Sequence, residues 1–302
     1  MKKALLIFNP VSGTNGAGDY VADLINQLTR QGYLTQALAT QKEGDEEAFI
    51  QALGEEQALI VILGGDGTLS HAVRGLVGLK NQPDLAYLPA GSTNDFAQGI
   101  GLGDLDQEQT IACASAGEAY PVDAGLFNET PFLYVAAFGL FTAVSYRTSQ
   151  EQKNSLGRLA YMLEGIKDLS QMKPYHLKIQ TEKQEMEGAF LLGIIANSNS
   201  IAGFQMLSHE ADYNDGQFEV MLLEASLGAL DLAAAIHDLV SGTENPHILR
   251  FQAQKLEIHA KEKLAWTLDG EEGEKGHTAQ IRVLEGALRF RLPEETHPAS
   301  KS

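Results

Sequence analysis

The feature that most constrains the fold of this chain is the glycine-rich turn Gly64-Gly65-Asp66-Gly67-Thr68. It stands directly between a continuous apolar run at 58–63 and a segment with helical spacing that begins near residue 69. A buried strand, a glycine turn and a helix together bring backbone N–H groups and the positive helix end to one anion. An Asp in such a turn repels phosphate unless a magnesium ion lies between them. The pattern therefore favours nucleotide binding over a tight turn whose glycines only supply positive φ.

Short apolar runs alternate with helical periodicity from Met1 to about Asp123. This alternation predicts a doubly wound, three-layer α/β domain in which helices cover both faces of a parallel sheet. The strands are expected at 4–8, 34–38, 58–63, 85–88 and 120–123, and the helices at 21–28, 48–53, 69–76 and after Asn94. Gly32 stands where the first helix should end.

Beyond about residue 126 the pattern changes to strands joined by turns, which predicts a mainly β, sandwich-like domain. Its strands are expected at 132–138, 175–180, 189–196, 218–223, 256–259, 264–268 and 281–284, with one amphipathic helix over 156–166. The expected organisation is a nucleotide-binding α/β domain at 1–126, a β-rich domain at 127–292 and a loose tail at 293–302. The last strand of the second domain could pack back on the first.

Composition narrows the function classes. A chain of 302 residues is long enough for two domains. Its net charge of -18 argues against nucleic-acid binding, because neutralising phosphates takes clustered Lys and Arg. The lone Cys113 leaves no internal disulfide and fits a reducing cytosol. Lys2 and Lys3 precede a run of only five apolar residues, which therefore reads as a buried strand and not as a signal segment.

Contact with a membrane is expected to be peripheral and transient. The most apolar helix candidate, 226–240, carries titratable side chains, so no stretch approaches the ~20 apolar residues needed to span a bilayer. Between Arg147 and Lys178 six Lys or Arg stand against three Asp or Glu, which reverses the ratio of 22 to 40 in the whole chain. We hypothesise that this stretch faces the inner membrane surface of the cell. The alternative is a helix that packs its Leu stripe on the β domain.

Two further small, polar, glycine-bearing loops follow predicted strands. One is 9–13, after the first strand, and the other is 88–97, which follows a strand and enters a helix. Ligands bind at the carboxyl ends of the strands in doubly wound folds, which is where all three loops lie. Ser92 or Thr93 could also be a simple helix cap, but three such loops at one sheet edge favour a common phosphate site.

With these loops the chain resembles the bacterial diacylglycerol kinase family, soluble lipid kinases whose catalytic domain is shared with eukaryotic diacylglycerol, sphingosine and ceramide kinases. The matching segments are Asn-Pro-Val-Ser-Gly at 9–13, Gly-Gly-Asp-Gly-Thr at 64–68 and Pro-Ala-Gly-Ser-Thr-Asn-Asp-Phe-Ala at 89–97. Asp-Tyr-Asn-Asp-Gly at 212–216 and Leu-Asp-Gly-Glu at 268–271 also match, so the resemblance covers nearly the whole chain.

The resemblance implies an ATP- and Mg²⁺-dependent transfer of the γ-phosphate to the hydroxyl of diacylglycerol or a related membrane lipid. The residues it implies in nucleotide binding are Asn9, Pro10, Ser12, Gly13, Thr40, Gly64, Gly65, Asp66, Gly67, Thr68, Gly91, Ser92, Thr93, Asn94 and Asp95. The implied metal site joins the Asp215 side chain to the backbone carbonyls of Asp212 and Gln217. Without the resemblance, Asn214-Asp215-Gly216 would be an Asx or hairpin turn.

Three carboxylates carry the implied catalysis. Glu271 is the family's proposed general base, since a hydroxyl that attacks the γ-phosphoryl group must lose its proton. Asp66 and Asp123 would complete an acidic network that holds metal and water. Composition alone would class Glu271 as one acid of a solvated turn. The sequence leaves open whether the chain forms a homodimer.

The chain departs from the family pattern at several positions. It has Ser70-His71 where Asn-Glu is frequent, Thr14-Asn15 where a Lys often follows the first loop, and Gln98 where a basic residue is common. These differences imply that the phosphates are bound more by backbone N–H groups and the metal than by basic side chains. We expect His71 to be a helix residue near the phosphates.

Two alternatives stay open. An NAD kinase shares the glycine turn, the two domains and the use of ATP, and its second Asn-Glu pair could be placed on Asn128-Glu129. That reading leaves the 9–13 loop unexplained. A non-catalytic nucleotide-binding regulator would keep the loops and lose the base, whereas Glu271 and Asp66 are both present.

Overall fold

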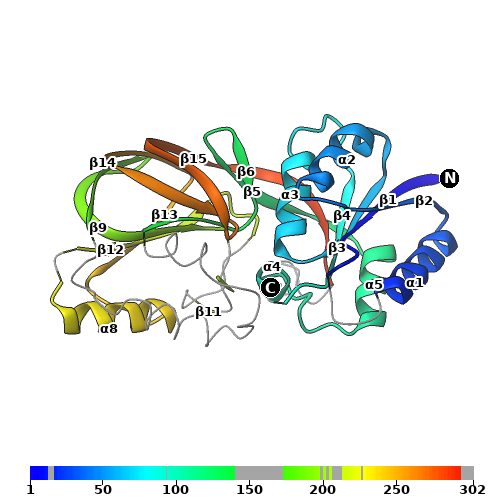
Figure 1. Ribbon diagram of the computed structural model, residues 1–302, viewed down its shortest axis with the longest axis horizontal. Coiled ribbons are helices and arrows are strands. Elements are labelled where there is room, and N and C mark those ends of the chain that lie inside the picture. Colours follow the sequence, from blue (N-terminus) through cyan, green and yellow to red (C-terminus); the bar gives the residue numbers. More distant parts are fainter. Residues whose placement is uncertain are drawn as a thin grey trace. The chain divides into compact units, whose positions relative to one another are not determined.

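The computed structural model describes residues 1–12, 17–92, 94–139, 173–197, 200–201, 204–205, 213–225 and 227–293. The chain forms two compact units (Figure 1). Unit 1 consists of Met1–Val122 and Gly286–Ser302, and unit 2 of Asp123–Glu285. The division lies between Val122 and Asp123, inside strand β5 (Ala119–Phe127), and the chain returns to unit 1 through the end of strand β15 (Glu271–Arg291).

Unit 1 is a parallel sheet between two layers of helices, as the alternation of apolar runs predicts (Figure 1). Its strands are β1 (Lys2–Phe8), β2 (Tyr33–Ala39), β3 (Leu59–Gly64) and β4 (Asp84–Pro89), in the order β4-β3-β1-β2. Its helices are α1 (Ala17–Arg30), α2 (Asp45–Leu53), the 3₁₀ turn η1 (Gly54–Glu56), α3 (Asp66–Leu76), α4 (Asp95–Gly99) and α5 (Gln107–Ala116).

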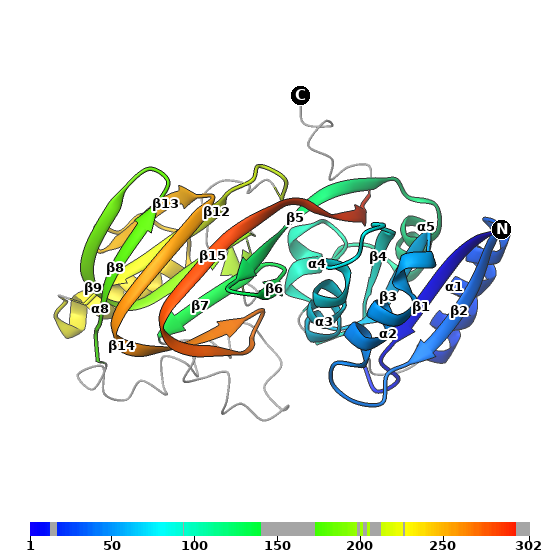
Figure 2. The same ribbon diagram turned by 90° about the horizontal axis from the view of Figure 1, so that it is seen from above.

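The core of unit 1 follows from strands that are apolar on both faces. β3 is buried over its whole length, which a central parallel strand requires. Leu24 and Leu28 of α1 join Ile111 of α5 in a buried cluster with one face of the sheet, while α2 and α3 cover the other face (Figure 2). Gly75 lets α2 and α3 approach, since a Cβ there would lie 2.9 Å from the Ile50 Cβ.

Helix α5 is an element that hydrophobic periodicity does not reveal. It contains few large apolar residues, so its sequence lacks a clear buried stripe. Its start is nevertheless defined by a capping box, in which the Asp106 carboxylate accepts the Gln109 N–H and the Gln109 side chain accepts the Asp106 N–H.

The end of β15 completes the sheet of unit 1 by pairing in parallel with β4. Arg291 fixes this return, because its guanidinium is buried and donates to the Ala114 carbonyl at 2.8 Å and the Tyr33 hydroxyl at 2.8 Å. The same group lies 3.3 Å from the Asp84 carboxylate. The last strand is thus bonded to β2, β4 and α5 at once.

Replacing Arg291 with Leu is expected to lower the free energy of unfolding by about 3 kcal/mol. This is the lower end of the range for breaking a buried ion pair. The lower end applies because Asp84 retains its ion pair with Arg289. Urea denaturation measures the change. The matched control is Arg289→Leu, whose side chain is half exposed and whose loss should cost less than about 1 kcal/mol. Equal losses in the two variants would contradict the assigned role of Arg291.

Cys113 lies beside this strand, with its Sγ donating to the Arg291 carbonyl at 3.6 Å. Burial raises the pKa of the Cys113 thiol to about 11, and the Arg291 charge only partly opposes this. Because the folded pKa is raised, the stabilising contribution of the neutral thiol is full below pH 9 and is lost as the pH rises toward 11. We expect a thiol reagent at pH 8 to modify native Cys113 far more slowly than the unfolded chain. Equal rates would contradict the burial.

Unit 2 consists mainly of antiparallel strands, as expected for a sandwich-like β domain. Its elements are β5, β6 (Thr130–Phe132), β7 (Val135–Gly139), β8 (Tyr175–Thr181), β9 (Glu185–Ala196), β10 (Ser200–Ile201), β11 (Phe204–Gln205), β12 (Phe218–Glu224), helix α8 (Ala229–Val240), β13 (Ile248–Ala253), β14 (Lys255–Leu268) and β15. The long strands β9 and β14 each pair with both β7 and β8, so these four strands close on themselves.

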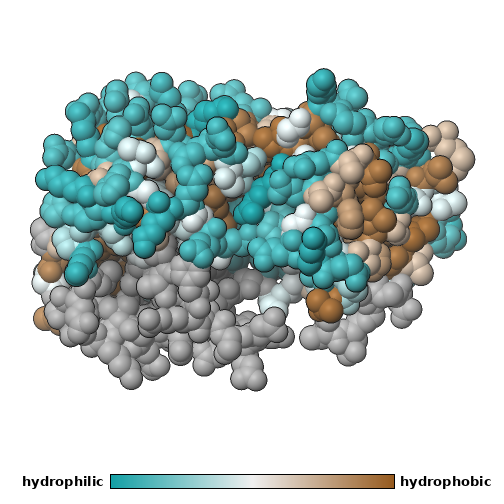
Figure 3. Space-filling model, turned by 45° about the horizontal axis from the view of Figure 1, so that its top comes forward, coloured by the Kyte–Doolittle hydropathy of each residue, from teal (hydrophilic) through white to brown (hydrophobic). Residues whose placement is uncertain are grey.

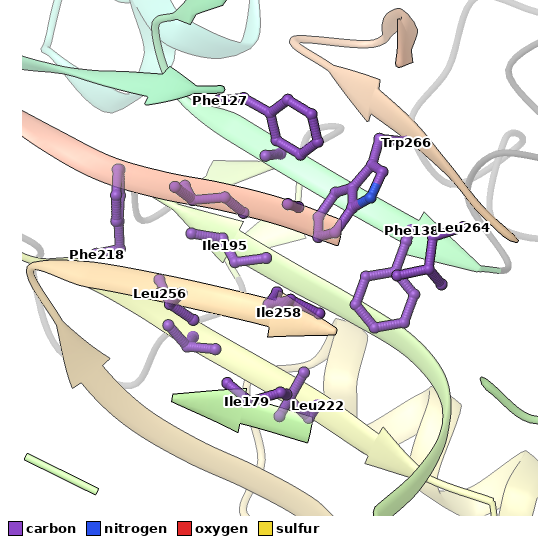
Figure 4. Close-up of a cluster of buried hydrophobic side chains, with 14 of the residues drawn as sticks. Phe127, Phe138, Ile179, Ile195, Phe218, Leu222, Leu256, Ile258, Leu264 and Trp266 are labelled. Carbon is purple, nitrogen blue, oxygen red and sulfur yellow. The ribbon is translucent and has the colours of Figure 1, made fainter. Parts of the chain in front are cut away.

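Aliphatic and aromatic side chains together fill the core of unit 2 (Figure 4). Trp266 lies between Phe127 and Phe138, with ring centroids 4.9 and 5.1 Å apart, and all three are almost completely buried. Figure 3 shows mainly hydrophilic residues on the outer side of this unit. That division matches the alternation of buried and exposed residues along the first half of β14.

The structure corrects several of the sequence-based assignments, among them the strand expected at 281–284, which is part of the longer β15. Helix α3 begins at Asp66 and not near residue 69. The expected strand at 132–138 is split into β6 and β7, because the amides between them donate to Asp269. The expected strands at 256–259 and 264–268 are one strand, β14, whose register shifts between His259 and Leu264. β13 was not predicted.

The helix expected at 156–166, most of the basic stretch at 147–178 and the tail after Pro293 lie outside the described residues. Within the apolar segment 226–240, helix α8 covers Ala229–Val240. None of the helices in the described ranges is long and apolar enough to cross a membrane.

Candidate active site

The carboxyl ends of four parallel strands bring the predicted nucleotide loops of unit 1 to one sheet edge. Asn9 follows β1, Thr40 follows β2, Gly65 follows β3 and Gly91 follows β4. The connection from β1 to β2 runs one way along the sheet and that from β3 to β4 runs the other way. The strand order therefore reverses between β1 and β3, which is where doubly wound folds bind ligands. The Asn9 N–H donates to the Leu63 carbonyl across this point at 3.1 Å.

The turn after β3 offers the start of a helix to an anion. Gly65 is the N-cap of α3 in an extended conformation, so Asp66, Gly67 and Thr68 already form the first helical turn. No hydrogen bond among the described residues takes the N–H groups of Gly67 and Thr68. Gly65 and Gly67 are only half-buried. The partial positive charge of the helix start therefore lies at the switch point, on N–H groups that no described residue uses.

The glycines of this turn are needed for space and not for positive φ, since Gly64, Gly65 and Gly67 all lie outside the left-handed region. A Cβ on Gly91 would lie 2.6 Å from the Gly65 Cα, and a Cβ on Gly64 would lie 2.6 Å from the Thr68 side chain. The 64–68 turn and the 88–97 loop thus touch backbone to backbone. A tight turn whose glycines only supply positive φ would not account for this contact.

Asp66 links the same two loops through its side chain. Its carboxylate accepts the N–H of Asp95 at 3.0 Å and the N–H of Phe96 at 3.4 Å. These are the first amides of α4, so Asp66 caps a helix thirty residues further along the chain. The first α4 amides are therefore used by Asp66, whereas those of Gly67 and Thr68 in α3 are used by no described residue.

Asn9 and Asn94 shape their loops with their side chains. The Asn9 Oδ1 accepts the Val11 N–H at 3.0 Å, and the Ser12 Oγ donates to the Asn9 carbonyl at 2.8 Å. Asn94 has φ 53°, and its Oδ1 accepts the Gly91 N–H at 2.8 Å. Pro10 and Ser92 are exposed. Gly13 and Thr93 lie outside the described residues.

Acidic groups gather beneath the loops. Burial raises the pKa of Tyr87 well above its usual value, and the nearby carboxylates of Asp66 and Asp95 raise it further. Asp95 is itself buried. Two carboxylates and a buried phenol in one region are an unfavourable environment for a polyphosphate unless a cation accompanies it.

His71 is buried in the second turn of α3 and faces α2. Its Nδ1 lies 3.6 Å from the buried carboxylate of Glu46, and its Nε2 lies 3.9 Å from the exposed carboxylate of Glu43. Thr40 is also buried, with its N–H donating to the Phe8 carbonyl at 3.0 Å. His71 is thus a helix residue that joins α3 to α2, next to the loop that carries Thr40.

In unit 2, Asp123 organises the turn that contains the predicted metal ligands. Asp123 is completely buried; its N–H donates to the Tyr213 carbonyl at 2.7 Å and its carboxylate accepts the Gly216 N–H at 2.8 Å. Its carbonyl accepts from Asn197 at 2.8 Å. Asp123 therefore holds this turn in place, a role that the sequence does not reveal.

The turn itself has the Asx geometry that its sequence suggests. The exposed Asp215 accepts the Gln217 N–H at 2.9 Å, and Gly216 has φ +70°. Asp212 lies outside the described residues, so the metal set of Asp212, Asp215 and Gln217 stays a prediction. A carboxylate has room for a cation beside one N–H donor, since it offers about four lone-pair sites.

Glu271 is half-buried at the first position of β15, directly after a two-residue turn. The turn residue Asp269 is 4% exposed, and its carboxylate accepts three backbone N–H groups. Composition alone classes this stretch as a solvated acidic turn, and the resemblance over 268–271 assigned no role to Asp269. The only signal was the Asp-Gly pair, which predicts a hairpin turn but not its burial. That Glu271 and the glycine turn act on one phosphate stays a prediction.

A doubly wound sheet with a glycine-rich helix start at its switch point, joined to a β sandwich-like unit, fits a class of phosphotransferases. Residues 3–127 match the family described as "Diacylglycerol kinase catalytic domain", and residues 135–291 match the "YegS C-terminal NAD kinase beta sandwich-like domain". The chain therefore belongs to the diacylglycerol kinase family, whose members are phosphotransferases with an alcohol group as acceptor.

Individual proteins agree with this assignment. The chain is 33% identical to a diacylglycerol kinase of Bacillus subtilis (strain 168) over 275 residues, which cover 90% of this chain and 91% of that protein. It is 33% identical to a diacylglycerol kinase of Staphylococcus epidermidis over 276 residues, 91% of this chain and 87% of that protein. A crystal structure of a provisionally named diacylglycerol kinase from Bacillus anthracis str. Sterne superposes with a TM-score of 0.82 at 25% identity, covering 97% of each chain.

The NAD kinase alternative loses its support in two places. The match over residues 3–127 is to the diacylglycerol kinase domain. Asn128, the residue needed for that alternative, has φ 51° in the turn between β5 and β6. Its Oδ1 accepts the Gln280 N–H at 2.9 Å and its Nδ2 donates to Glu274 at 2.7 Å, so Asn128 braces a turn against β15.

Proposed function

We propose that this chain is an ATP- and Mg²⁺-dependent lipid kinase that phosphorylates the free hydroxyl of diacylglycerol. The observation that carries the proposal is the start of α3, where no hydrogen bond among the described residues takes the N–H groups of Gly67 and Thr68, and where Gly65 contacts Gly91. Backbone N–H groups at a helix start are suited to the phosphates of ATP. The loop at 9–12 would lie along the same edge.

A divalent cation is needed for electrostatic reasons. The chain has a net charge of -18, and Asp66 and Asp95 lie beside the loops. Mg²⁺ prefers one or two carboxylates together with phosphate oxygens and water, which is the chemistry that these side chains offer. In unit 2 the Asp215 carboxylate, with the carbonyls of Asp212 and Gln217, would form a second cation site. When bound, the ion would neutralise charge on the phosphates.

The proton of the acceptor is assigned to Glu271. In the transfer, the lipid hydroxyl oxygen forms a bond to the γ-phosphorus while the bond from that phosphorus to the bridging oxygen of ADP breaks. The hydroxyl proton passes to the Glu271 carboxylate. The proposal thus assigns phosphate holding to unit 1 and proton acceptance to unit 2.

The choice of diacylglycerol rests on the relatives. The Bacillus subtilis and Staphylococcus epidermidis proteins that match nearly the whole chain are both named diacylglycerol kinases. A test uses the purified chain with radiolabelled ATP, with and without Mg²⁺, against diacylglycerol, ceramide, sphingosine and NAD. We expect the label to appear in phosphatidic acid and to disappear when Mg²⁺ is chelated. Label only in NADP would favour the NAD kinase, and tight ATP binding without any labelled product would favour a regulator.

Peripheral membrane contact is a part of this proposal, because the acceptor resides in a bilayer. The reversal of charge at 147–178 supports it. Neutralising Lys153, Arg158, Lys167 and Lys173 together is expected to reduce co-sedimentation with anionic vesicles. Unchanged binding of that variant would remove this stretch from the contact.

A further inference from the structure

The candidate base Glu271 follows a hairpin turn with an unusually well-defined geometry. Leu268 of β14 pairs with Glu271 of β15, so Asp269 and Gly270 alone form the turn. Their φ angles are 52° and 86°, and left-handed values at both central residues are those of a type I′ turn. Asp-Gly is a favoured pair for this turn. The backbone position of Glu271 is therefore determined by the residue pair directly before it.

The tip of this hairpin is buried and anchored. Asp269 is 4% exposed, whereas hairpin turns normally lie at the surface. Its carboxylate accepts the N–H groups of Leu133 at 2.7 Å, Tyr134 at 2.9 Å and Val135 at 3.1 Å. In return, the Asp269 N–H donates to the Val135 carbonyl at 2.8 Å. The Tyr134 hydroxyl also donates to the Asp269 carbonyl at 3.4 Å, so at least five hydrogen bonds join the turn to one short segment.

That segment is arranged around the carboxylate. Residues 133 and 134 separate β6 from β7, so the strand predicted at 132–138 is interrupted where its amides turn to Asp269. β7 then resumes and pairs with β14, with Ala136 opposite Leu268. The anchor and the strand ladder are therefore continuous, and a movement of the turn would have to break both.

We propose that Asp269 is a positioning residue that holds Glu271 in the orientation required to accept the proton of the acceptor hydroxyl. This inference rests on the proposed function, in which Glu271 is the general base. Only an ionised carboxylate can accept all three N–H groups, because an amide side chain would turn its own N–H₂ group toward them. Asp269 acts through Glu271 and need not touch substrate.

The test is a double-mutant cycle on Asp269→Asn and Glu271→Gln. Asp269→Asn is expected to lower kcat by about 10²-fold, the loss that a catalytic group suffers when it is misplaced by about 1 Å, with the KM for ATP unchanged. In the Glu271→Gln background, the same change should lower residual turnover by less than about threefold, because a residue that acts through an absent base has nothing left to position. Turnover is measured with enough enzyme to quantify the residual rates.

The matched control is Glu182→Gln. The Glu182 carboxylate also accepts backbone N–H groups in unit 2, those of Gln254 and Lys255 at 3.3 and 3.4 Å, at the other end of β14. We expect this variant to turn over normally. If Asp269→Asn does not fold, Gly270→Ala provides the second route, since φ +86° strains an Ala and nothing crowds its Cβ.

Each outcome has a distinct meaning. Full additivity with Glu271→Gln, or normal turnover of Asp269→Asn, would overturn the positioning role and leave the base assignment intact. Normal turnover of Glu271→Gln itself would remove the base and with it the positioning role. A loss in the Glu182 control equal to that of Asp269→Asn would show general damage to unit 2 and also overturn the inference.

Discussion

Replacing Glu271 with Gln is expected to lower turnover by about 10²- to 10⁴-fold, the range that a general base contributes, while ATP binding stays within about twofold of the original. Gln has nearly the same shape as Glu and cannot accept a proton at neutral pH. The phosphate-binding N–H groups belong to α3 in unit 1 and are untouched by the change. Steady-state kinetics with diacylglycerol gives turnover, and titration with a fluorescent ATP analogue gives binding.

The adjacent acid provides the control. Glu272 follows Glu271 in the same strand and is exposed, and successive side chains of a strand point to opposite faces. Glu272→Gln removes the same charge from nearly the same place and should leave turnover unchanged. If Glu271→Gln keeps near-normal turnover, or if the two variants lose equal activity, Glu271 is not the base.

The sheet of unit 1 could be predicted because its signals are local. β3 is a continuous apolar run, which few structures other than a central parallel strand accommodate. Gly32, with φ 82°, lies in the turn between the end of α1 and the start of β2, as expected. The three loops were placed correctly because each directly follows such a strand. Their common edge is then a consequence of parallel topology.

The bonds that give the loops their roles could not be predicted, because they join residues far apart in sequence. Asp66 caps α4 and Asp269 gathers amides from residues 133–135, and neither partner is marked by a local pattern. A carboxylate that accepts distant backbone N–H groups looks in sequence like any other surface acid. Asp123, completely buried, is the extreme case.

The same limit explains the misplaced boundaries. Strand β14 was divided because polar residues interrupt its apolar pattern, whereas the strand continues through a register shift. Helix α3 was started late because glycines disfavour helices, yet Gly67 lies in its first turn.

Replacing Asp66 with Ala should damage catalysis and fold together. The variant loses the acceptor of the Asp95 and Phe96 N–H groups, which should cost about 1 kcal/mol in the free energy of unfolding, as for other helix caps. It also loses a carboxylate beside the phosphate loops, and we expect turnover to fall by about 10³-fold, as when a preorganised electrostatic group is removed. Urea denaturation and kinetics at several Mg²⁺ concentrations measure the two effects.

Asp106→Ala separates these two effects. Asp106 is also an Asp in unit 1 that caps a helix, with its carboxylate accepting the Gln109 N–H at 2.8 Å at the start of α5. Both variants should lose about 1 kcal/mol of stability, since each loses one cap. Only Asp66→Ala should lose turnover and require more Mg²⁺ for half-maximal rate, because only Asp66 lies beside the Gly65 and Gly91 backbones. If Asp66→Ala loses stability alone, Asp66 is a cap for α4, and the cation must be held by other groups.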